Sequence, residues 1–180
     1  MKKNFLVTRP VLQSEKVSEL LCKEGFEVII EPISDVKYLK CDEKEVKNLK
    51  KGEIQAILIT SFNASETFLN FNLDKNVPIY AVGEKSIEKI LENGYKNVIF
   101  PEKSNVSELE RLFLQQNCDQ AGQILYFCGN YLTKDLKLSF KERGFDVQKI
   151  QSYIVKYHDE FSANFLDLIK IKKIDNILCY

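Results

Sequence analysis

Five short polar segments of the 180-residue sequence each follow an apolar run and could bind an oxygen-rich anion. In open α/β sheets, ligands bind beyond the carboxyl ends of the strands, where the first N–H groups of the next helix lack partners. Small polar residues and two glycines favour an anion that is held mostly by backbone N–H groups. The segments are TRP at 8–10, TSFN at 60–63, VGEKS at 82–86, PEKSN at 101–105 and CGN at 128–130.

The same residues also have an ordinary structural interpretation. Ser, Thr and Asn after a strand are common helix N-caps, and glycine there is common in turns. Gly83 and Gly129 lack the flanking glycines of a dinucleotide-binding or Walker loop, so neither of those nucleotide sites is predicted. The segments are therefore candidates for binding, with capping as the alternative.

Other chemistry has little support in the sequence. His158 is the single histidine, which excludes most hydrolase triads and every multi-histidine metal site, and we expect it to be a solvated residue at a segment boundary. Glu31, Asp35 and Glu84 could lie near a cleft, but no spacing singles out a pair for general acid–base catalysis. We therefore expect no metal site.

The cysteines are odd in number and no two are separated by two residues, which fits neither a disulfide framework nor a zinc ribbon. We expect all five to be plain thiols in a reducing compartment. They are Cys22, Cys41, Cys118, Cys128 and Cys179.

The composition is that of a globular chain, with 44% hydrophobic and 29% charged residues. Lys plus Arg and Asp plus Glu are both 26, and a formal net charge of zero argues against a nucleic-acid binder with a broad basic surface. No apolar run approaches the roughly 20 residues that cross a bilayer. The opening residues MKKNFLVTRP lack the apolar stretch and cleavage site of a signal peptide. We expect a cytoplasmic protein.

Apolar strands alternate with amphipathic helices along the chain, which predicts an α/β fold with doubly wound, flavodoxin-like parallel sheets. Gly25, Gly94 and Gly144 are expected to end helices, and Asn105 with Glu108 resembles a capping box. Strands are expected at 5–8, 27–31, 54–60, 79–82, 98–100, 123–128, 146–152 and 177–180. Helices are expected at 14–23, 43–51, 64–71, 85–93, 106–116, 132–143 and 163–172.

The distribution of these elements predicts two domains, one inserted into the other. Residues 38–152 hold a complete five-stranded α/β unit, whereas 1–34 alone cannot cover both faces of its sheet. We expect 1–34 and 158–180 to form one discontinuous, incomplete domain, with hinge strands near 34–39 and 152–157. Its exposed apolar strands, 27–30 and 177–180, could support self-association of a chain otherwise expected to be a monomer.

Several motifs, in order over essentially the whole chain, resemble the uroporphyrinogen-III synthase family. They are LVTRP at 6–10, EVIIEPI at 27–33, AILITSFNA at 56–64, PIYAVGEKS at 78–86, ILYFCGN at 124–130 and VQKIQSYIVKY at 147–157. The family usually has Thr where Ser86 stands.

The resemblance implies two α/β domains joined by a two-stranded ladder. It implies an enzyme that cyclises the linear tetrapyrrole hydroxymethylbilane to uroporphyrinogen III, with loss of water and inversion of the last pyrrole ring. No metal or organic cofactor takes part. Hydroxymethylbilane also closes without help to the uninverted isomer. The substrate carries eight carboxylates, which helix N-termini can hold without a large positive charge.

The resemblance also assigns candidate site residues. Tyr153 matches the tyrosine of the hinge segment and could help the hydroxyl leave as a general acid, with a packed hinge aromatic as the alternative. The expected substrate-binding residues are Thr8, Arg9, Pro10, Ser61, Phe62, Asn63, Ala64, Val82, Gly83, Ser86, Gly129 and Asn130.

Members of the family continue beyond the strand that matches 177–180, so we expect this 180-residue form to be impaired. The alternative function is a non-catalytic tetrapyrrole- or anion-binding module on the same fold. A receiver-like signalling domain fits poorly, because the loop after 54–60 has no acid before Glu66.

Overall fold

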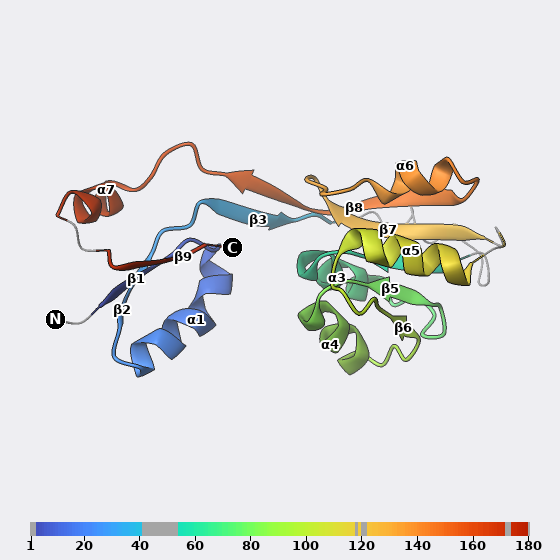
Figure 1. Ribbon diagram of the computed structural model, residues 1–180, viewed down its shortest axis with the longest axis horizontal. Coiled ribbons are helices and arrows are strands. Elements are labelled where there is room, and N and C mark those ends of the chain that lie inside the picture. Colours follow the sequence, from blue (N-terminus) through green and yellow to red (C-terminus); the bar gives the residue numbers. More distant parts are fainter. Residues whose placement is uncertain (1–2, 41–53, 118, 120–121, 172–173, 180) are drawn as a thin grey trace. The chain divides into compact units, whose positions relative to one another are not determined.

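The computed structural model describes residues 3–40, 54–117, 119, 122–171 and 174–179. The chain divides into two compact units (Figure 1). Unit 1 consists of Met1–Lys37 and Val155–Tyr180, and unit 2 consists of Tyr38–Ile154. The helix expected at 43–51 lies outside the described residues.

Unit 1 is built on a parallel three-stranded sheet with the order β2-β1-β9. These strands are β1 (Asn4–Val7), β2 (Glu27–Ile30) and β9 (Asn176–Leu178). Helix α1 (Val11–Lys23) packs on β1 and β2, and α7 (Ala163–Lys170) precedes β9. The first and last parts of the chain therefore share one sheet.

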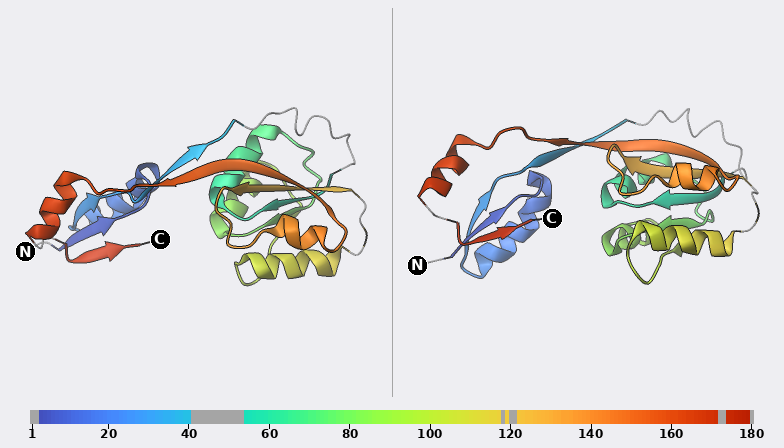
Figure 2. Two further views of the ribbon diagram at one scale, coloured as in Figure 1. Left: turned by 90° about the horizontal axis from the view of Figure 1, so that it is seen from above. Right: turned by 45° about the horizontal axis from the view of Figure 1, so that its top comes forward.

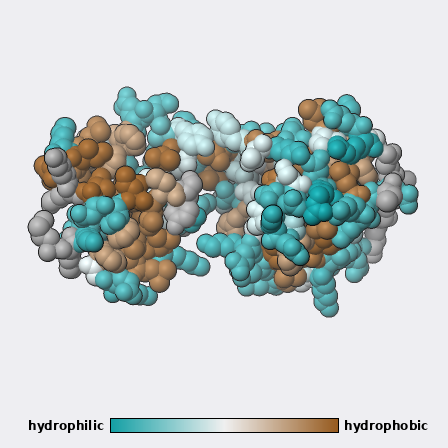
Figure 3. All heavy atoms as spheres, viewed as in Figure 1, coloured by the Kyte–Doolittle hydropathy of each residue, from teal (hydrophilic) through white to brown (hydrophobic). Residues whose placement is uncertain are grey.

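Unit 1 leaves much apolar surface exposed. Leu6 and Val7 of β1 are buried, but Ile30 at the end of β2 is 39% exposed and Ile177 of β9 is 57% exposed. Figure 3 shows hydrophobic residues gathered over this unit. Other large apolar residues that are exposed in unit 1 are Val11, Leu20, Ile33, Phe161, Leu166, Ile169 and Ile171.

The second sheet has the strand order β3-β8-β7-β4-β5-β6. Its strands are β3 (Ser34–Tyr38), β4 (Ile54–Ile59), β5 (Ile79–Ala81), β6 (Val98–Ile99), β7 (Gln123–Gly129) and β8 (Asp146–Tyr157). The five strands from β8 to β6 are parallel. β3 runs antiparallel to β8, because Leu39 N bonds Ser152 O (2.9 Å) while His158 N bonds Ile33 O (3.0 Å).

The parallel α/β class is thus confirmed. Counted from β4 along the chain, the five parallel strands have the order 3-2-1-4-5, one of the two common doubly wound orders. The flavodoxin order would be 2-1-3-4-5. The 3-2-1-4-5 order reverses between β4 and β7, which marks that carboxyl edge as the expected ligand site.

Helices cover both faces of this sheet (Figure 2). α3 (Phe62–Phe68), with the 3₁₀ turn Leu69–Phe71, and α4 (Glu84–Glu92) lie on one face. α5 (Val106–Gln116) and α6 (Leu136–Lys141) lie on the other, where the rings of Phe113 and Phe140 stack with centroids 4.8 Å apart. Ile57 and Leu58, adjacent in β4, are both fully buried because both faces are covered.

Two elements differ most from the predicted bounds, α6 at its start and β8 at its end. The helix expected at 132–143 begins only at Leu136, because the side chain of Asp135 accepts a hydrogen bond from Lys137 N (3.0 Å) and caps it. The strand expected to end at 152 continues to Tyr157, because β3 pairs with it. In the part of the chain that the structure describes, no helix has the length and apolar character needed to cross a membrane.

Candidate active site

Gly129, the last residue of β7, pairs with Tyr153 in the second half of β8. Cys128 pairs with Gln151 and Gly129 with Tyr153, so Ser152 is the extra residue of a β-bulge. The bulge breaks the alternation of buried and exposed side chains, because Ser152 and Tyr153 are adjacent and both buried. A Cβ at position 129 would lie 2.5 Å from Cζ of Tyr153 and 2.8 Å from its hydroxyl oxygen. Only glycine fits beside this ring.

The phenol of Tyr153 is hydrogen-bonded to Ser61, the residue that caps α3. Burial raises the pKa of Tyr153, the bond to Ser61 lowers it, and Cys128 raises it. Oγ of Ser61 also accepts a hydrogen bond from Asn63 N (3.3 Å). The sequence left capping and function as alternatives for Ser61, and the structure shows that its hydroxyl serves the cap and contacts the predicted catalytic tyrosine.

A second buried phenol lies at the same edge of the sheet. The hydroxyl of Tyr126 is 3.4 Å from Oγ1 of Thr60, and burial raises the pKa of Tyr126 to about 12. Burial also raises the pKa of the Cys128 thiol to about 11, so this thiol is protonated and weakly nucleophilic at neutral pH. These groups act at neutral pH as hydrogen-bond donors and acceptors rather than as bases.

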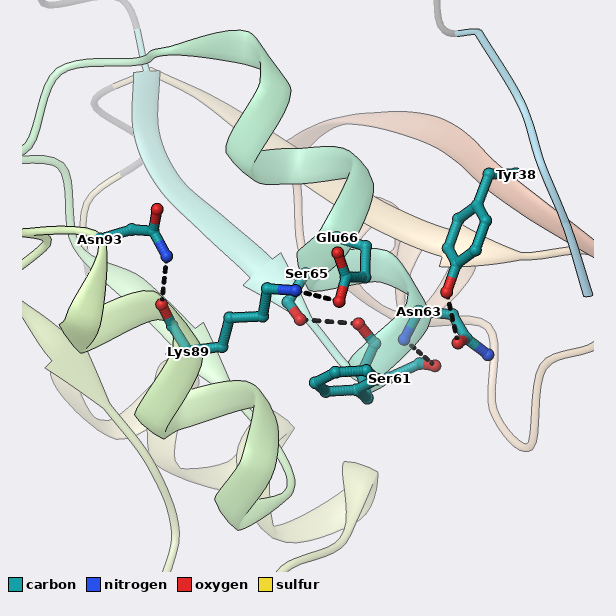
Figure 4. Close-up of polar contacts among 8 residues, drawn as sticks. Tyr38, Ser61, Asn63, Ser65, Glu66, Lys89 and Asn93 are labelled. Atoms are coloured by element: carbon teal, nitrogen blue, oxygen red, sulfur yellow. Dashed lines mark hydrogen bonds and ion pairs between the residues drawn. The ribbon is translucent and has the colours of Figure 1, made fainter. Parts of the chain in front are cut away.

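Asn63 meets a third tyrosine, Tyr38 of β3. The hydroxyl of Tyr38 donates a hydrogen bond to Oδ1 of Asn63 (3.1 Å; Figure 4). Burial raises the pKa of Tyr38, and the charges of Glu66 and Tyr153 raise it further. Tyr38 therefore holds the amide of a predicted binding residue in a defined orientation.

The start of α3 also carries an ion pair to α4. Lys89 of α4 pairs with Glu66 of α3 (Figure 4), and Nζ of Lys89 lies 5.2 Å from the ring centroid of Phe62. Ala64 is fully buried and packs α3 into the unit. Phe62 is 38% exposed and stands at the first position of the helix.

The loop after β5 holds the next group of predicted residues. Gly83 has a φ of +92° and precedes α4, and its N–H donates to Oγ of Ser104 (3.0 Å). Ser86 is buried in the first turn of α4, and Val82 N bonds Ile59 O (2.9 Å). Asn130 is exposed immediately after Gly129. Unit 2 thus places most of the predicted binding residues in the loops at one edge of its sheet.

Unit 1 holds Thr8, Arg9 and Pro10 at the carboxyl end of β1. The hydroxyl of Thr8 donates to the carbonyl of Leu178 in β9 (3.1 Å), so it ties two strands together. The carbonyls of Arg9 and Pro10 accept hydrogen bonds from the buried Ser14 hydroxyl at 3.0 and 3.2 Å. The hydroxyls here serve the local structure.

The acids considered in the sequence have local partners. The carboxylate of Glu31 accepts from Ser162 N (2.6 Å) and from the Ser162 hydroxyl (2.7 Å). Asp35 contacts His158 at 2.9 Å, and the pKa of the exposed His158 is raised chiefly by that hydrogen bond. Glu84 stands in the first turn of α4. None of these acids contacts Tyr153 through a described hydrogen bond.

Two residues of the site, Tyr126 and Tyr38, were missed by the sequence analysis. The signal for Tyr126 was available: a residue with a hydroxyl stands inside the apolar run ILYFCGN, and a buried tyrosine usually finds a hydrogen-bond partner. Tyr38 gave no comparable signal in its polar segment. Among the described residues, no group of three or more His, Cys, Asp or Glu side chains could hold a metal ion.

Comparison with known proteins decides the family. Residues 15–180 match the family described as "Uroporphyrinogen-III synthase HemD". The chain belongs to the uroporphyrinogen-III synthase family. This membership confirms the resemblance and the predicted class of enzyme, a lyase of porphyrin biosynthesis whose substrate is a tetrapyrrole.

Solved structures of the family have the same fold. A mutant uroporphyrinogen III synthase from the extremely thermophilic bacterium Thermus thermophilus superposes with a TM-score of 0.69 at 16% identity, over 97% of this chain and 71% of its own. Uroporphyrinogen-III synthetase from Helicobacter pylori gives a TM-score of 0.53 at 17% identity, over 91% of this chain and 66% of its own. No curated protein matches the sequence significantly.

Proposed function

We propose that this chain cyclises hydroxymethylbilane to uroporphyrinogen III, with Tyr153 as the general acid. The family supplies the reaction, and the observation that carries the residue assignment is the position of Tyr153. Its ring lies against Gly129, which ends β7. Its hydroxyl bonds to Ser61, which lies in the loop after β4. The strand order reverses between these two strands, which is where doubly wound sheets bind ligands.

The chemistry of Tyr153 suits the loss of water. Burial raises its pKa, so the phenol stays protonated at neutral pH and is available as a donor. The phenol proton passes to the substrate hydroxyl as the carbon–oxygen bond breaks, and water departs. Proton transfer by a positioned side chain contributes typically 10²- to 10⁴-fold to a rate.

The loops around Tyr153 supply donors for the substrate's carboxylates in this proposal. Ser61, Phe62, Asn63 and Ala64 start α3, while Val82, Gly83 and Ser86 surround the start of α4. Gly129 and Asn130 follow β7. In unit 1, α1 begins directly after Pro10 and has no side-chain cap, so Thr8, Arg9 and Pro10 lead to the N-terminus of a helix.

Three properties of the whole protein belong to the same proposal. Units 1 and 2 are two domains, and the boundaries at 37/38 and 154/155 fall inside the expected hinge segments 34–39 and 152–157. The protein works in the cytoplasm, consistent with the free thiols of Cys22, Cys128 and Cys179. We also propose that it is a monomer, and that it does not bind nucleic acid, the latter consistent with its zero formal net charge.

The test is the product formed from hydroxymethylbilane, in an assay that separates the inverted type III isomer from the uninverted one. We expect type III isomer from the 180-residue chain and a loss of at least about 100-fold in its rate with Tyr153→Phe. Tyr131→Phe is the matched control, because Tyr131 is 62% exposed in the loop after β7.

Two results would contradict the proposal. A chain that folds but makes only the uninverted isomer is a binding module rather than a synthase. A Tyr153→Phe variant as active as Tyr131→Phe removes the general-acid role and leaves Tyr153 as a packed aromatic.

A further inference from the structure

The Glu66–Lys89 ion pair lies beside the candidate site and has no role in the proposed mechanism. Lys89 comes from α4 and reaches Glu66 on α3 (Figure 4). The side chains of Lys89 and Glu66 keep 28% and 34% of their surface exposed. Both partners can therefore meet a ligand from solvent.

Two contacts connect the pair to the site. Nζ of Lys89 is 5.2 Å from the ring centroid of Phe62, the residue directly after Ser61, which in turn bonds the phenol of Tyr153. The hydroxyl of Tyr38 bonds Asn63, and the pKa of Tyr38 is raised first by burial and next by the negative charge of Glu66. The ammonium of Lys89 thus stands at the first turn of α3, next to the predicted binding residues.

We infer that Lys89 binds a carboxylate of the substrate, and that Glu66 occupies Lys89 until the substrate takes its place. This inference rests on the proposed function only for the chemistry of the ligand, a tetrapyrrole with several carboxylates. Exchange of one carboxylate for another costs little at this partly exposed pair, because solvent screens the attraction between the two charges. The ammonium keeps a charged partner throughout.

The inference makes the two partners act in opposite directions. Loss of Lys89 removes an attractive contact with the ligand. Loss of the charge on Glu66 removes a competitor and a repelling charge, so binding becomes tighter. If the pair only holds α3 against α4, a different result is expected. Both substitutions then lower stability, and they do not change binding in opposite directions.

The experiment is a fluorescence titration of the full chain with uroporphyrin III, the oxidised macrocycle that carries eight carboxylates. We expect Lys89→Met to raise its Kd about tenfold, because the ligand's carboxylate loses its cationic partner and then meets the uncompensated charge of Glu66. We expect Glu66→Gln to lower the Kd about two- to fivefold, which corresponds to the worth of a half-exposed ion pair. In the Lys89→Met background only the repulsion by Glu66 remains to be removed, so Glu66→Gln should lower the Kd by less than it does in the unsubstituted chain.

Lys75→Met is the matched control, because it removes the same charge elsewhere in unit 2. Lys75 stands before β5, where its Nζ bonds Asn93 O (3.0 Å) and lies 3.6 Å from the ring centroid of Tyr95. Its Kd should equal that of the unsubstituted chain. Thermal unfolding of every variant, measured in parallel, identifies a variant that binds poorly because it is unfolded.

The inference is overturned if Glu66→Gln weakens binding, or if folded Lys89→Met binds like Lys75→Met. Its failure is separable from that of the proposed function. If the chain forms the type III isomer and Lys89→Met does not change the Kd, only the inference is refuted. Sign-specific binding without any type III isomer refutes the synthase activity alone.

Discussion

The aromatic ring of Tyr153 occupies the space that a side chain at position 129 would need. Gly129 and Tyr153 pair across β7 and β8, and a Cβ at 129 would fall 2.5 Å from Cζ and 2.6 Å from Cε2 of the ring. The requirement for glycine is steric, since φ at Gly129 lies outside the left-handed region. The glycine that ends β7 therefore determines where the phenol of Tyr153 sits.

Gly129→Ala should displace the ring of Tyr153 and lower both stability and activity. Overpacking of a filled site costs typically about 1–3 kcal/mol, and the displaced phenol loses its bond to Ser61. We expect unfolding free energy to fall by that amount, and the rate of type III formation to fall as far as in Tyr153→Phe.

A double-mutant cycle with Tyr153→Ala checks this steric cause. If the ring is what excludes a methyl group at 129, Gly129→Ala costs far less once Tyr153 is truncated, and the two changes are non-additive. Additive costs would show that Gly129 is needed for some other reason.

Unit 2 should lose stability in alkali because of its buried phenols. Burial raises the pKa of Tyr126 from 10 to about 12. Because the folded pKa lies above the unfolded one, the stability is fully present below about pH 10 and is lost as the pH rises through 12, by up to about 3 kcal/mol for this group. Denaturant unfolding at several alkaline pH values measures the loss.

Tyr126→Phe tests which phenol is responsible. This variant has no group to ionise at position 126, so its unfolding free energy should fall less steeply between about pH 9 and 12. Tyr131→Phe, which removes an exposed phenol, should decline like the unsubstituted chain. Equal slopes in all three proteins would contradict the assignment to Tyr126.

Glu110 should stabilise the packing of α5 against α6. Its carboxylate is buried and contacts Lys134, Ser139 and Arg143. Burial alone would raise its pKa, but hydrogen bonds from Lys134 and Ser139 and the nearby positive charges together lower it. Glu110→Gln keeps a hydrogen-bonding group for Ser139 but removes the negative charge. We expect the free energy of unfolding to fall by about 1–2 kcal/mol, a modest loss because Lys134 and Arg143 are exposed to solvent.

The lowered pKa of Glu110 also predicts how the effect of Glu110→Gln on stability changes with pH. A lowered folded pKa means that the stabilisation is present above the ordinary carboxyl pKa of 4.5 and is lost as the pH falls below it. The difference between the unsubstituted chain and Glu110→Gln should therefore shrink on acidification. Glu108→Gln, on the exposed side of the same helix, should change stability by no more than about 0.5 kcal/mol. A difference independent of pH would exclude the charge as the cause.

Amide hydrogen exchange should be faster in the sheet of unit 1 than in β4 and β7. Those two strands have a parallel neighbour on each side and covered faces, whereas β2 and β9 are edge strands with exposed apolar residues. Exchange measured by mass spectrometry on the monomer tests this. Equal protection of 3–30 and 54–129 would contradict it.

Local sequence signals were sufficient for most of the elements of this fold. Gly25, Gly94 and Gly144 end their helices with φ between +84° and +86°, as predicted. Asn105 caps α5 through a bond from Glu108 N (2.9 Å), although the Glu108 carboxylate turns to Arg111 instead of completing a capping box. These helix ends and caps involve residues that are neighbours in the chain, so they can be predicted from the sequence alone. Asp135 is an equally local signal for the start of α6, which the prediction placed at 132 instead.

The sequence by itself determined the succession of strands and helices and the family. Apolar periodicity, helix caps and short motifs each depend on residues that lie within a few positions of one another in the sequence. Tertiary structure alone decided the strand order, the bulge at Ser152 and the meeting of hydroxyls at one sheet edge. Thr60 and Tyr126 are 66 residues apart along the chain, and no local pattern brings them to 3.4 Å. Such contacts depend on which strands pair and in what register, and these are settled only when the whole sheet packs between its helices.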